Sequence, residues 1–258
     1  MNAYQPIQAF PLEHRQQIAL IATDVDGTLT NQEKFPSILV QTLEQLAAAG
    51  IAVLLVTGRS AGWVQGLVHY LPVVGAIAEN GGVFYQKDAA APEILTPILD
   101  IAEHRRHLAQ IFQCLQLQVL GLVESTDNPF RLTDWTFEIQ QLSPAELKIL
   151  SQLCHQQGQG FTYSTVQCHI KPQKQDKATG LRHVLSNYFP ELQPQQVVTI
   201  GDSPNDESLF NPEYFPHSFG VANIIEYRSR LQYFPAYVTQ ATSASGFCEL
   251  AQLLINLP

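Results

Sequence analysis

The sequence predicts an α/β protein in which a parallel sheet carries helices on both faces. Short apolar runs that end in polar residues alternate with stretches whose apolar residues follow helical spacing. The connections between them are short, as they are in βαβ units. This alternation stops after about residue 85 and returns after Lys177. An insertion of roughly 90 residues, within the usual size range of a domain, is therefore predicted to split one α/β domain.

The first third of the chain is predicted to hold three buried strands and two helices. Residues 1–17 are polar and mixed, and we expect them to form a loose arm. Gly50 stands where the first helix should end, and Pro72 follows the second helix. In chain order, the predicted strands are residues 18–24, 51–56 and 73–78, and the predicted helices are residues 38–47 and 60–70.

A different pattern in the middle of the chain predicts a smaller α+β unit. Ser143 is expected to cap the second helix of this unit at its N-terminus, and Gly158 lies beyond its end. The predicted helices are residues 101–115 and 144–156, and the predicted strands are residues 117–123, 135–139 and 161–170.

The last third of the chain is predicted to complete the parallel sheet. The core domain would then comprise residues 1–85 and 174–258, and the inserted α/β domain residues 86–173. The predicted strands are residues 197–200, 219–222 and 237–239, and helices are expected at residues 178–188, from residue 207, and at residues 245–257.

Composition argues against several classes of partner. The 258 residues include 23 acidic and 14 basic side chains, for a formal charge of -9, whereas proteins that bind nucleic acid usually carry a basic excess. The four cysteines form no CxxC pair, which favours reduced thiols over a zinc or redox site. No apolar run approaches the ~20 residues of a membrane span, and no secretory signal is found. We expect a soluble, cytoplasmic protein, and no pattern indicates its oligomeric state.

Polar side chains follow the predicted core strands at the edge where open α/β sheets bind ligands. Packed carboxylates repel one another unless a cation neutralises them. Magnesium suits oxygen ligands and normally uses one or two carboxylates, with waters and a phosphate completing its shell. The pattern therefore predicts a Mg²⁺ site at this edge. The side chains concerned are Asp24, Asp26, Thr57, Asn80, Asp202 and Asp206.

The segment Asp24-Val-Asp-Gly-Thr28 has residue types that suit phosphoryl transfer. Residues two apart on an extended strand point the same way, so two carboxylates can face one substrate. One can attack phosphorus, and the other can move protons. Gly27 allows a sharp turn that exposes backbone amides to an anion. The alternatives are a solvated Asp-Gly turn and a calcium loop, and the calcium loop lacks its later ligands and closing glutamate.

Four segments, in the right order, resemble the motifs of the haloacid dehalogenase superfamily of phosphohydrolases. The resemblance covers nearly the whole chain. The insertion between the second and third motifs is similar to the cap of Cof-like, subfamily IIB members, which implies a Rossmann-like core. Glu79-Asn-Gly-Gly-Val-Phe-Tyr85 resembles the signature before that cap, and the sucrose-phosphatase-like and phosphoglycolate-phosphatase-like branch looks most similar. The four motifs are Asp24-Val-Asp-Gly-Thr-Leu-Thr30, Val56-Thr-Gly-Arg59, Asp176-Lys-Ala-Thr-Gly-Leu181 and Gly201-Asp-Ser-Pro-Asn-Asp206.

The resemblance implies a phosphatase and gives these residues roles. Asp24 would be the nucleophile, and Asp26 would protonate the leaving oxygen and then activate water. Lys177 would offset the charge of nucleophile and phosphate. Asp202, Asp24 and the backbone carbonyl of Asp26 would bind Mg²⁺. Thr57 and the amides near Gly58 would bind phosphate, and Asn205 and Asp206 would orient the metal shell. Asn80 and Arg59 would contact the substrate, although Arg59 could instead cap the following helix.

The inserted domain is expected to determine substrate specificity, because the core would bind only the phosphate group. Arg131, Asp134, Tyr163 and His169 are its polar candidates, each expected to be structural rather than functional. Small sugar phosphates and 2-phosphoglycolate both remain candidate substrates. The residue types at Asp134, Trp135 and Glu138 slightly favour recognition of a sugar. The alternatives are a phosphomutase of the same superfamily and a catalytically silent metabolite-binding protein.

Overall fold

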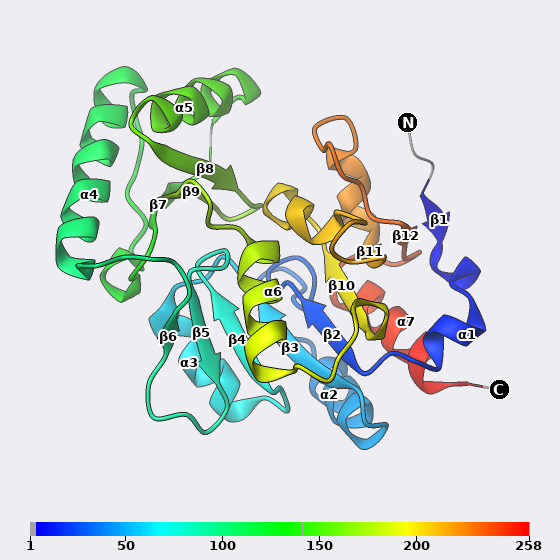
Figure 1. Ribbon diagram of the computed structural model, residues 1–258. Helices are drawn as coiled ribbons and strands as arrows, with labels where there is room; N and C mark the ends of the chain where they lie inside the picture. Colours follow the sequence, from blue (N-terminus) through cyan, green and yellow to red (C-terminus); the bar gives the residue numbers. More distant parts are fainter. Residues whose placement is uncertain (1–3, 141, 258) are drawn as a thin grey trace.

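A nine-stranded sheet forms the centre of the computed structural model, which describes residues 4–140 and 142–257 (Figure 1). Neighbouring strands from β1 to β4 in sheet order are parallel, while β5 runs antiparallel to both β4 and β6. The predicted parallel α/β class is confirmed. In sheet order the strands are β1 (Gln5–Pro6), β12 (Tyr237–Val238), β11 (His217–Gly220), β10 (Val197–Gly201), β2 (Leu20–Thr23), β3 (Ala52–Val56), β4 (Gly75–Ala78), β5 (Val83–Gln86) and β6 (Glu93–Ile94).

Alternate residues of each central strand enter two separate cores, one on each face of this sheet. In β2, Ile21 joins the first core, while Leu20 and Ala22 join the second. Helices α2 (Ser37–Ala48), α3 (Ala61–Tyr70) and α7 (Ser243–Ile255) cover the first face, and α6 (Lys177–Tyr188) with the 3₁₀ helix η4 (Pro204–Phe210) covers the second. With both faces covered, the central strands are mainly apolar, as the sequence suggested.

A smaller antiparallel sheet lies between β6 and α6 in the chain, with the strand order β7-β9-β8. Figure 1 shows its two helices on the side away from the large sheet. The Ser143 hydroxyl accepts a hydrogen bond from the Glu146 amide, so the predicted N-cap is confirmed. Strand β6 pairs with β5 although it falls inside the segment predicted as the insertion. The elements are α4 (Ile101–Gln118), β7 (Trp135–Glu138), α5 (Pro144–Gln156), β8 (Gln159–Tyr163) and β9 (Gln167–Pro172).

The N-terminal segment differs from the predicted loose arm, of which residues 1–3 lie outside the described chain. Strand β1 extends the large sheet beside β12, and the short helices η1 (Ile7–Ala9) and α1 (Leu12–Arg15) follow it. Ile7 and Phe10 are buried, and the Phe10 ring lies 5.1 Å from that of Phe219. Two isolated apolar residues produce no periodic pattern, which is why the sequence did not indicate this packing.

Two predictions for the smaller sheet were wrong in detail. No strand forms over residues 117–123, because α4 continues to Gln118 and keeps Leu108, Phe112 and Leu115 on its buried face. Residues 161–170 were predicted as one strand, but they contain parts of β8 and β9 and the turn between them. That turn lies near the edge of the large sheet where the predicted polar side chains gather.

No helix in the described ranges is both long enough and apolar enough to cross a membrane. The four cysteines are free, as expected from their spacing, although Cys114 is exposed rather than part of a core.

Candidate active site

The turn after β2 carries the two predicted catalytic carboxylates. The Asp24 amide donates to the Ile200 carbonyl of the neighbouring strand at 2.9 Å, which ties the start of the turn to β10. Gly27 adopts a φ of 77°, in the region that favours glycine. A Cβ atom there would lie 2.2 Å from Oδ2 of Asp202, so only glycine lets the turn approach that carboxylate.

The loop after β10 contributes the second pair of carboxylates. Asp202 is buried next to Gly27, and Asp206 lies on η4, one turn further along the chain. Oδ2 of Asp206 accepts the backbone amides of Asp202 and Ser203, at 2.9 and 3.1 Å. Asp206 therefore holds this loop in shape with one oxygen and leaves the other for Lys177, while its role in orienting a metal shell stays a prediction.

Lys177 is the first residue of α6, and its ammonium group joins the two carboxylate pairs. The Asp176 side chain caps the helix by accepting the Thr179 amide at 2.7 Å. The Nζ atom of Lys177 then lies 2.6 Å from Oδ1 of Asp24 and 2.6 Å from Oδ1 of Asp206. Burial lowers the pKa of Lys177, but the two carboxylates outweigh it, and the net pKa is raised. The lysine is therefore charged throughout the physiological range.

Three carboxylates form a group that could hold a cation. Oxygen atoms of Asp24, Asp202 and Asp206 lie within 4.8 Å of one another. Burial, with repulsion from Asp206 and Asp26, raises the pKa of Asp24 to about 7 despite Lys177, and burial raises the pKa of Asp202 well above its ordinary value. Oδ1 of Asp202 is buried and lacks a hydrogen-bond partner in the described chain. An oxygen-preferring divalent cation fits this donor set and would relieve the repulsion.

The Asp26 side chain does not join that group. Its two oxygens accept hydrogen bonds from Nε and Nη2 of Arg59, at 2.7 and 2.6 Å. The Arg59 guanidinium also lies over the Trp63 ring, 5.0 Å from its centroid. Neither predicted role of Arg59, phosphate contact or helix cap, anticipated this ion pair. A ligand role for the Asp26 backbone carbonyl stays a prediction.

The remaining predicted substrate-binding residues follow β3 and β4. Thr57 is buried, and its hydroxyl accepts the Arg59 amide at 3.1 Å. Asn80 is held at a φ of 52°, and its Oδ1 accepts a hydrogen bond from Nδ2 of Asn205 at 3.0 Å. Nδ2 of Asn80 is buried without a partner in the described chain. The structure thus brings Asn80 and Asn205 together at the edge of the site, with one donor unused.

Glu79 connects the core to the segment that leads into the smaller sheet. Its carboxylate accepts the amides of Ala61, Leu132 and Thr133 at 2.6–3.1 Å, and also the Thr133 hydroxyl at 2.8 Å. Burial raises the pKa of Glu79, with Asp134 adding to the effect and Arg131 opposing it. Fully buried, Glu79 contacts the connection to the smaller sheet rather than the predicted catalytic groups.

Three of the polar residues that were predicted to be structural meet beside the site. Arg131 is fully buried and donates to Asp134, to Asp127 and to the Gly58 carbonyl, the last at 3.0 Å. Asp134 also lies 2.8 Å from Nδ1 of His169. Because Asp134 is buried in these contacts, its carboxylate is not free to bind a sugar, and the preference for a sugar substrate stays a prediction. Tyr163 does not border the catalytic cavity.

The cavity at the predicted catalytic residues is small, about 10 Å³, which is close to the space of one water. The core lines one side and the smaller sheet the other. Sequence reasoning missed Ser164, Val166 and Gln167, because the turn between β8 and β9 was predicted as continuous strand. The lining residues are Asp24, Asp26, Gly58, Arg59, Ser164, Val166, Gln167, His169 and Asn205.

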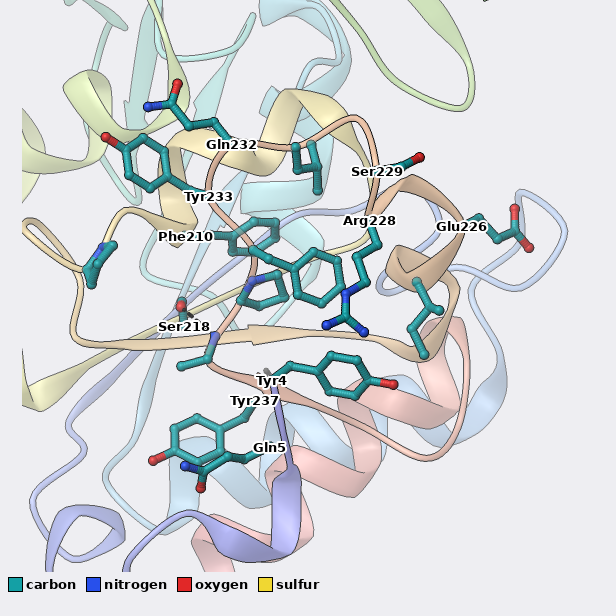
Figure 2. Close-up of a pocket in the computed structure, with 16 residues that line it drawn as sticks. Tyr4, Gln5, Phe210, Ser218, Glu226, Arg228, Ser229, Gln232, Tyr233 and Tyr237 are labelled. Atoms are coloured by element: carbon teal, nitrogen blue, oxygen red, sulfur yellow. Dashed lines mark hydrogen bonds between the residues drawn. The ribbon is translucent and has the colours of Figure 1, made fainter. Parts of the chain in front are cut away.

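Two of the larger hollows in the described part of the chain bear on the choice of site. One, of about 290 Å³, separates the core from the smaller sheet and also touches Asn80 and Asn205. The other, of about 910 Å³, lies beside β1 and β11 and contains none of the predicted catalytic residues. Figure 2 shows Arg228 there between aromatic rings, and its guanidinium lies 5.0 Å from the ring centroid of Tyr4. A choice of site based on cavity volume alone would therefore have missed the converging carboxylates.

Known proteins resemble this chain over most of its length. A family model described as haloacid dehalogenase-like hydrolase matches residues 21–120 and 122–229. A phosphoglycolate phosphatase of Methanothrix thermoacetophila is 26% identical over 90% of this chain and 95% of its own. Another phosphoglycolate phosphatase, from Sulfolobus acidocaldarius, is 31% identical over 73% of this chain and 78% of its own.

Solved structures share the fold at low identity. The C-terminal domain of trehalose-6-phosphate phosphatase from C. albicans aligns over 100% of both chains, with a TM-score of 0.72 and 15% identity. The sucrose-phosphatase of Synechocystis aligns over 93% of this chain and 98% of its own, with a TM-score of 0.68 and 17% identity.

The chain belongs to the haloacid dehalogenase-like hydrolase family, so the family inferred from the four motifs is confirmed. The expectation of an enzyme of the phosphatase class is confirmed as well.

Proposed function

We propose that the protein is a Mg²⁺-dependent phosphomonoester hydrolase that acts on a small phosphorylated metabolite through an aspartyl-phosphate. The observation that carries this proposal is the meeting of Lys177 with Asp24 and Asp206, beside Asp202. A buried lysine that balances carboxylates at the edge of a parallel sheet is suited to stabilise the added charge of a phosphate. The acidic charge of the chain disfavours nucleic acid as the substrate.

In the first step an Asp24 oxygen forms a bond to phosphorus, and the bond from phosphorus to the leaving oxygen breaks. The leaving oxygen keeps the electron pair and takes a proton from Asp26. Lys177 holds the attacking carboxylate in place through its 2.6 Å contact and offsets the negative charge of the phosphate. Thr57 and the amides near Gly58 bind the phosphate oxygens.

In the second step water attacks phosphorus and gives its proton to Asp26, and the bond between phosphorus and Asp24 breaks. Free phosphate and the original carboxylate result. Asp24 and Asp202 would hold Mg²⁺, with Asp206 and Asn205 orienting these ligands. When bound, the cation supplies charge neutralisation for the phosphate oxygens.

Asp26 must change partners during this cycle. A carboxylic acid cannot donate its proton to an ester oxygen while both of its oxygens accept from the Arg59 guanidinium. An incoming phosphate offers Arg59 a more highly charged partner. We therefore expect phosphate to draw Arg59 away from Asp26, which leaves Asp26 free to act as the acid.

Residues 86–173 serve in this proposal as the domain that selects the substrate. Its β8–β9 turn and His169 border the small catalytic cavity. The relatives named phosphoglycolate phosphatase favour 2-phosphoglycolate. The 290 Å³ cleft favours a sugar phosphate, because amides, the carboxylates of Asp176 and Glu207 and the aromatic ring of Tyr233 line it.

The test is release of inorganic phosphate by the purified protein from 2-phosphoglycolate, sucrose 6-phosphate and hexose phosphates. Mg²⁺-dependent release that disappears in Asp24→Asn, with an unchanged circular dichroism spectrum, is the expected result. Transfer of the phosphoryl group to another position of the same sugar would indicate a mutase. No release that depends on Asp24 would contradict the proposal and leave a metabolite-binding protein.

A further inference from the structure

His169 projects from β9 onto the backbone of the predicted phosphate loop. A Cβ atom added to Gly58 would lie 3.1 Å from Cε1 and 3.2 Å from Nε2 of His169. The imidazole is therefore packed edge-on against Gly58, where the chain has no side chain of its own. His169 also lines the small cavity together with Asp24 and Asp26.

The other edge of the same ring determines where its proton lies. Nδ1 of His169 is 2.8 Å from Oδ2 of Asp134, which also accepts from Arg131. Burial raises the pKa of Asp134, but Arg131 and His169 outweigh it, so this carboxylate is ionised. Burial lowers the pKa of His169, although Asp134 opposes the effect. The imidazole is thus neutral with its proton on Nδ1, and Nε2 keeps a lone pair.

Asn80 supplies a donor at the same place. Its Nδ2 atom lies 3.3 Å from the position of the Cβ atom that Gly58 lacks, and it is buried without a partner in the described chain. Its Oδ1 atom is occupied by Nδ2 of Asn205, which fixes the orientation of the amide. Nε2 of His169 and Nδ2 of Asn80 therefore both lie against Gly58, and neither atom has a hydrogen-bond partner in the described chain.

We propose that His169 and Asn80 together bind a hydroxyl group of the leaving group, so that the preferred substrate is a hydroxylated phosphate ester rather than a phosphorylated carboxylic acid. A hydroxyl can donate to Nε2 and accept from Nδ2 at once, whereas an ionised carboxylate has no proton for Nε2. The inference rests on the proposed phosphatase activity and specifies its substrate class.

The surroundings of this pair agree with that assignment. The residues that the smaller sheet contributes to the cavity are Ser164, Val166, Gln167 and His169, none of which is a lysine or an arginine. Asn80 also borders the 290 Å³ cleft, which has room for the rest of a hydroxylated leaving group. Lys171 borders that cleft too, but its ammonium donates to the Gln175 carbonyl and is buried.

The experiment compares three esters that differ in one group: 2-hydroxyethyl phosphate, ethyl phosphate and 2-phosphoglycolate. A neutral hydrogen bond corresponds to a factor of about 3 to 10 in kcat/KM, so the hydroxylated ester should exceed ethyl phosphate by about that factor. His169→Asn keeps a donor toward Asp134 but removes the acceptor over Gly58, and should abolish this preference. The matched control is His155→Asn, at an exposed position on α5, which should retain it.

Preference for 2-phosphoglycolate, or an unchanged preference in His169→Asn, would overturn the assignment. Failure of all three esters, together with every sugar phosphate, to release phosphate in an Asp24-dependent reaction would instead defeat the proposed function and this inference with it. A readout that needs no turnover is the ¹⁵N NMR shift of the His169 ring in the wild-type protein. An unprotonated Nε2 at neutral pH is expected, and a protonated Nε2 would refute the acceptor role.

Discussion

The Nζ atom of Lys177 lies 2.6 Å from Oδ1 of Asp24, although 153 residues separate the two in the chain. This contact joins the first turn of α6 to the end of β2. It spans the smaller sheet and its helices, all of which lie between these two residues in sequence. The ammonium group is the one basic group in contact with the carboxylates of Asp24 and Asp206 in the described part of the chain.

Lys177→Met should therefore destabilise the metal-free protein as well as stop turnover. Removing the ammonium leaves buried carboxylates without a balancing charge, which costs about 3–5 kcal/mol. Urea unfolding in the presence of EDTA measures the change in the free energy of unfolding. Lys174→Met is the control, because Lys174 is exposed only three residues away. Equal unfolding midpoints for the two variants would contradict this charge-balancing role.

The effect of Mg²⁺ on stability should increase with pH. The pKa of Asp24 is raised from 3.8 to about 7, so the folded protein binds this proton more tightly than the unfolded chain does. The stability from this group is therefore fully present below pH 3.8 and is lost as pH rises through about 7. Mg²⁺ binds the ionised carboxylates, so it should raise the Tm more at pH ~8 than at pH ~5.

Differential scanning calorimetry with Mg²⁺ and with EDTA, at both pH values, tests this expectation. Asp202→Asn should reduce the response to Mg²⁺ at the higher pH, because it removes one of the three converging carboxylates. A Tm increase of the same size at both pH values would show that the titration of these carboxylates is not linked to the cation.

The parts of the fold and site that the sequence predicted have local signals. Asp24, Thr57 and Asp202 each follow a buried apolar run, and the geometry of a parallel sheet brings such strand ends together. Lys177, the first residue of α6, was distinguishable by its motif from Lys174, which lies three residues earlier. For these residues, the apolar runs that precede them and the order of the motifs along the chain were sufficient to predict where they lie.

The contacts that the sequence did not predict connect residues without a shared local pattern. Arg59 pairs with Asp26 across 33 positions, and His169 pairs with Asp134 across 35. Each of these polar residues taken alone is most often structural. Only the register of β9 against β7, which places His169 opposite Thr136, brings the imidazole to Gly58.

Gly27→Ala should weaken Mg²⁺ binding more than it weakens the fold. The new Cβ atom would lie 2.2 Å from Oδ2 of Asp202 and would displace that carboxylate. A displaced ligand shell typically costs about 10–100-fold in metal affinity. Isothermal titration with Mg²⁺ measures this loss.

Gly50→Ala is a matched control for Gly27→Ala. Gly50 has a φ of 78°, against 77° for Gly27, so both variants carry the same backbone strain of about 1–2 kcal/mol. No atom lies within 4 Å of a Cβ at Gly50. Its Mg²⁺ affinity should match the wild type, and an equal loss in both variants would assign the effect to backbone strain rather than to Asp202.

Glu79→Gln should loosen the connection between the core and the smaller sheet. The carboxylate accepts the amides of Ala61, Leu132 and Thr133, and a glutamine would turn its own NH₂ group toward some of these donors. Leaving buried amides unpaired costs about 1–3 kcal/mol each. We expect faster hydrogen exchange at the Leu132 and Thr133 amides, with a lower free energy of unfolding.

Thr133→Val separates the carboxylate's role from that of the Thr133 hydroxyl. It removes only this hydroxyl, which donates to Oε2 of Glu79 at 2.8 Å and accepts from Nε2 of Gln175 at 3.1 Å, and keeps both backbone amides on the carboxylate. Its cost should be about 1 kcal/mol, and exchange at Leu132 should stay slow. If Leu132 instead exchanges equally fast in both variants, the Thr133 hydroxyl orders this segment, and the carboxylate of Glu79 does not.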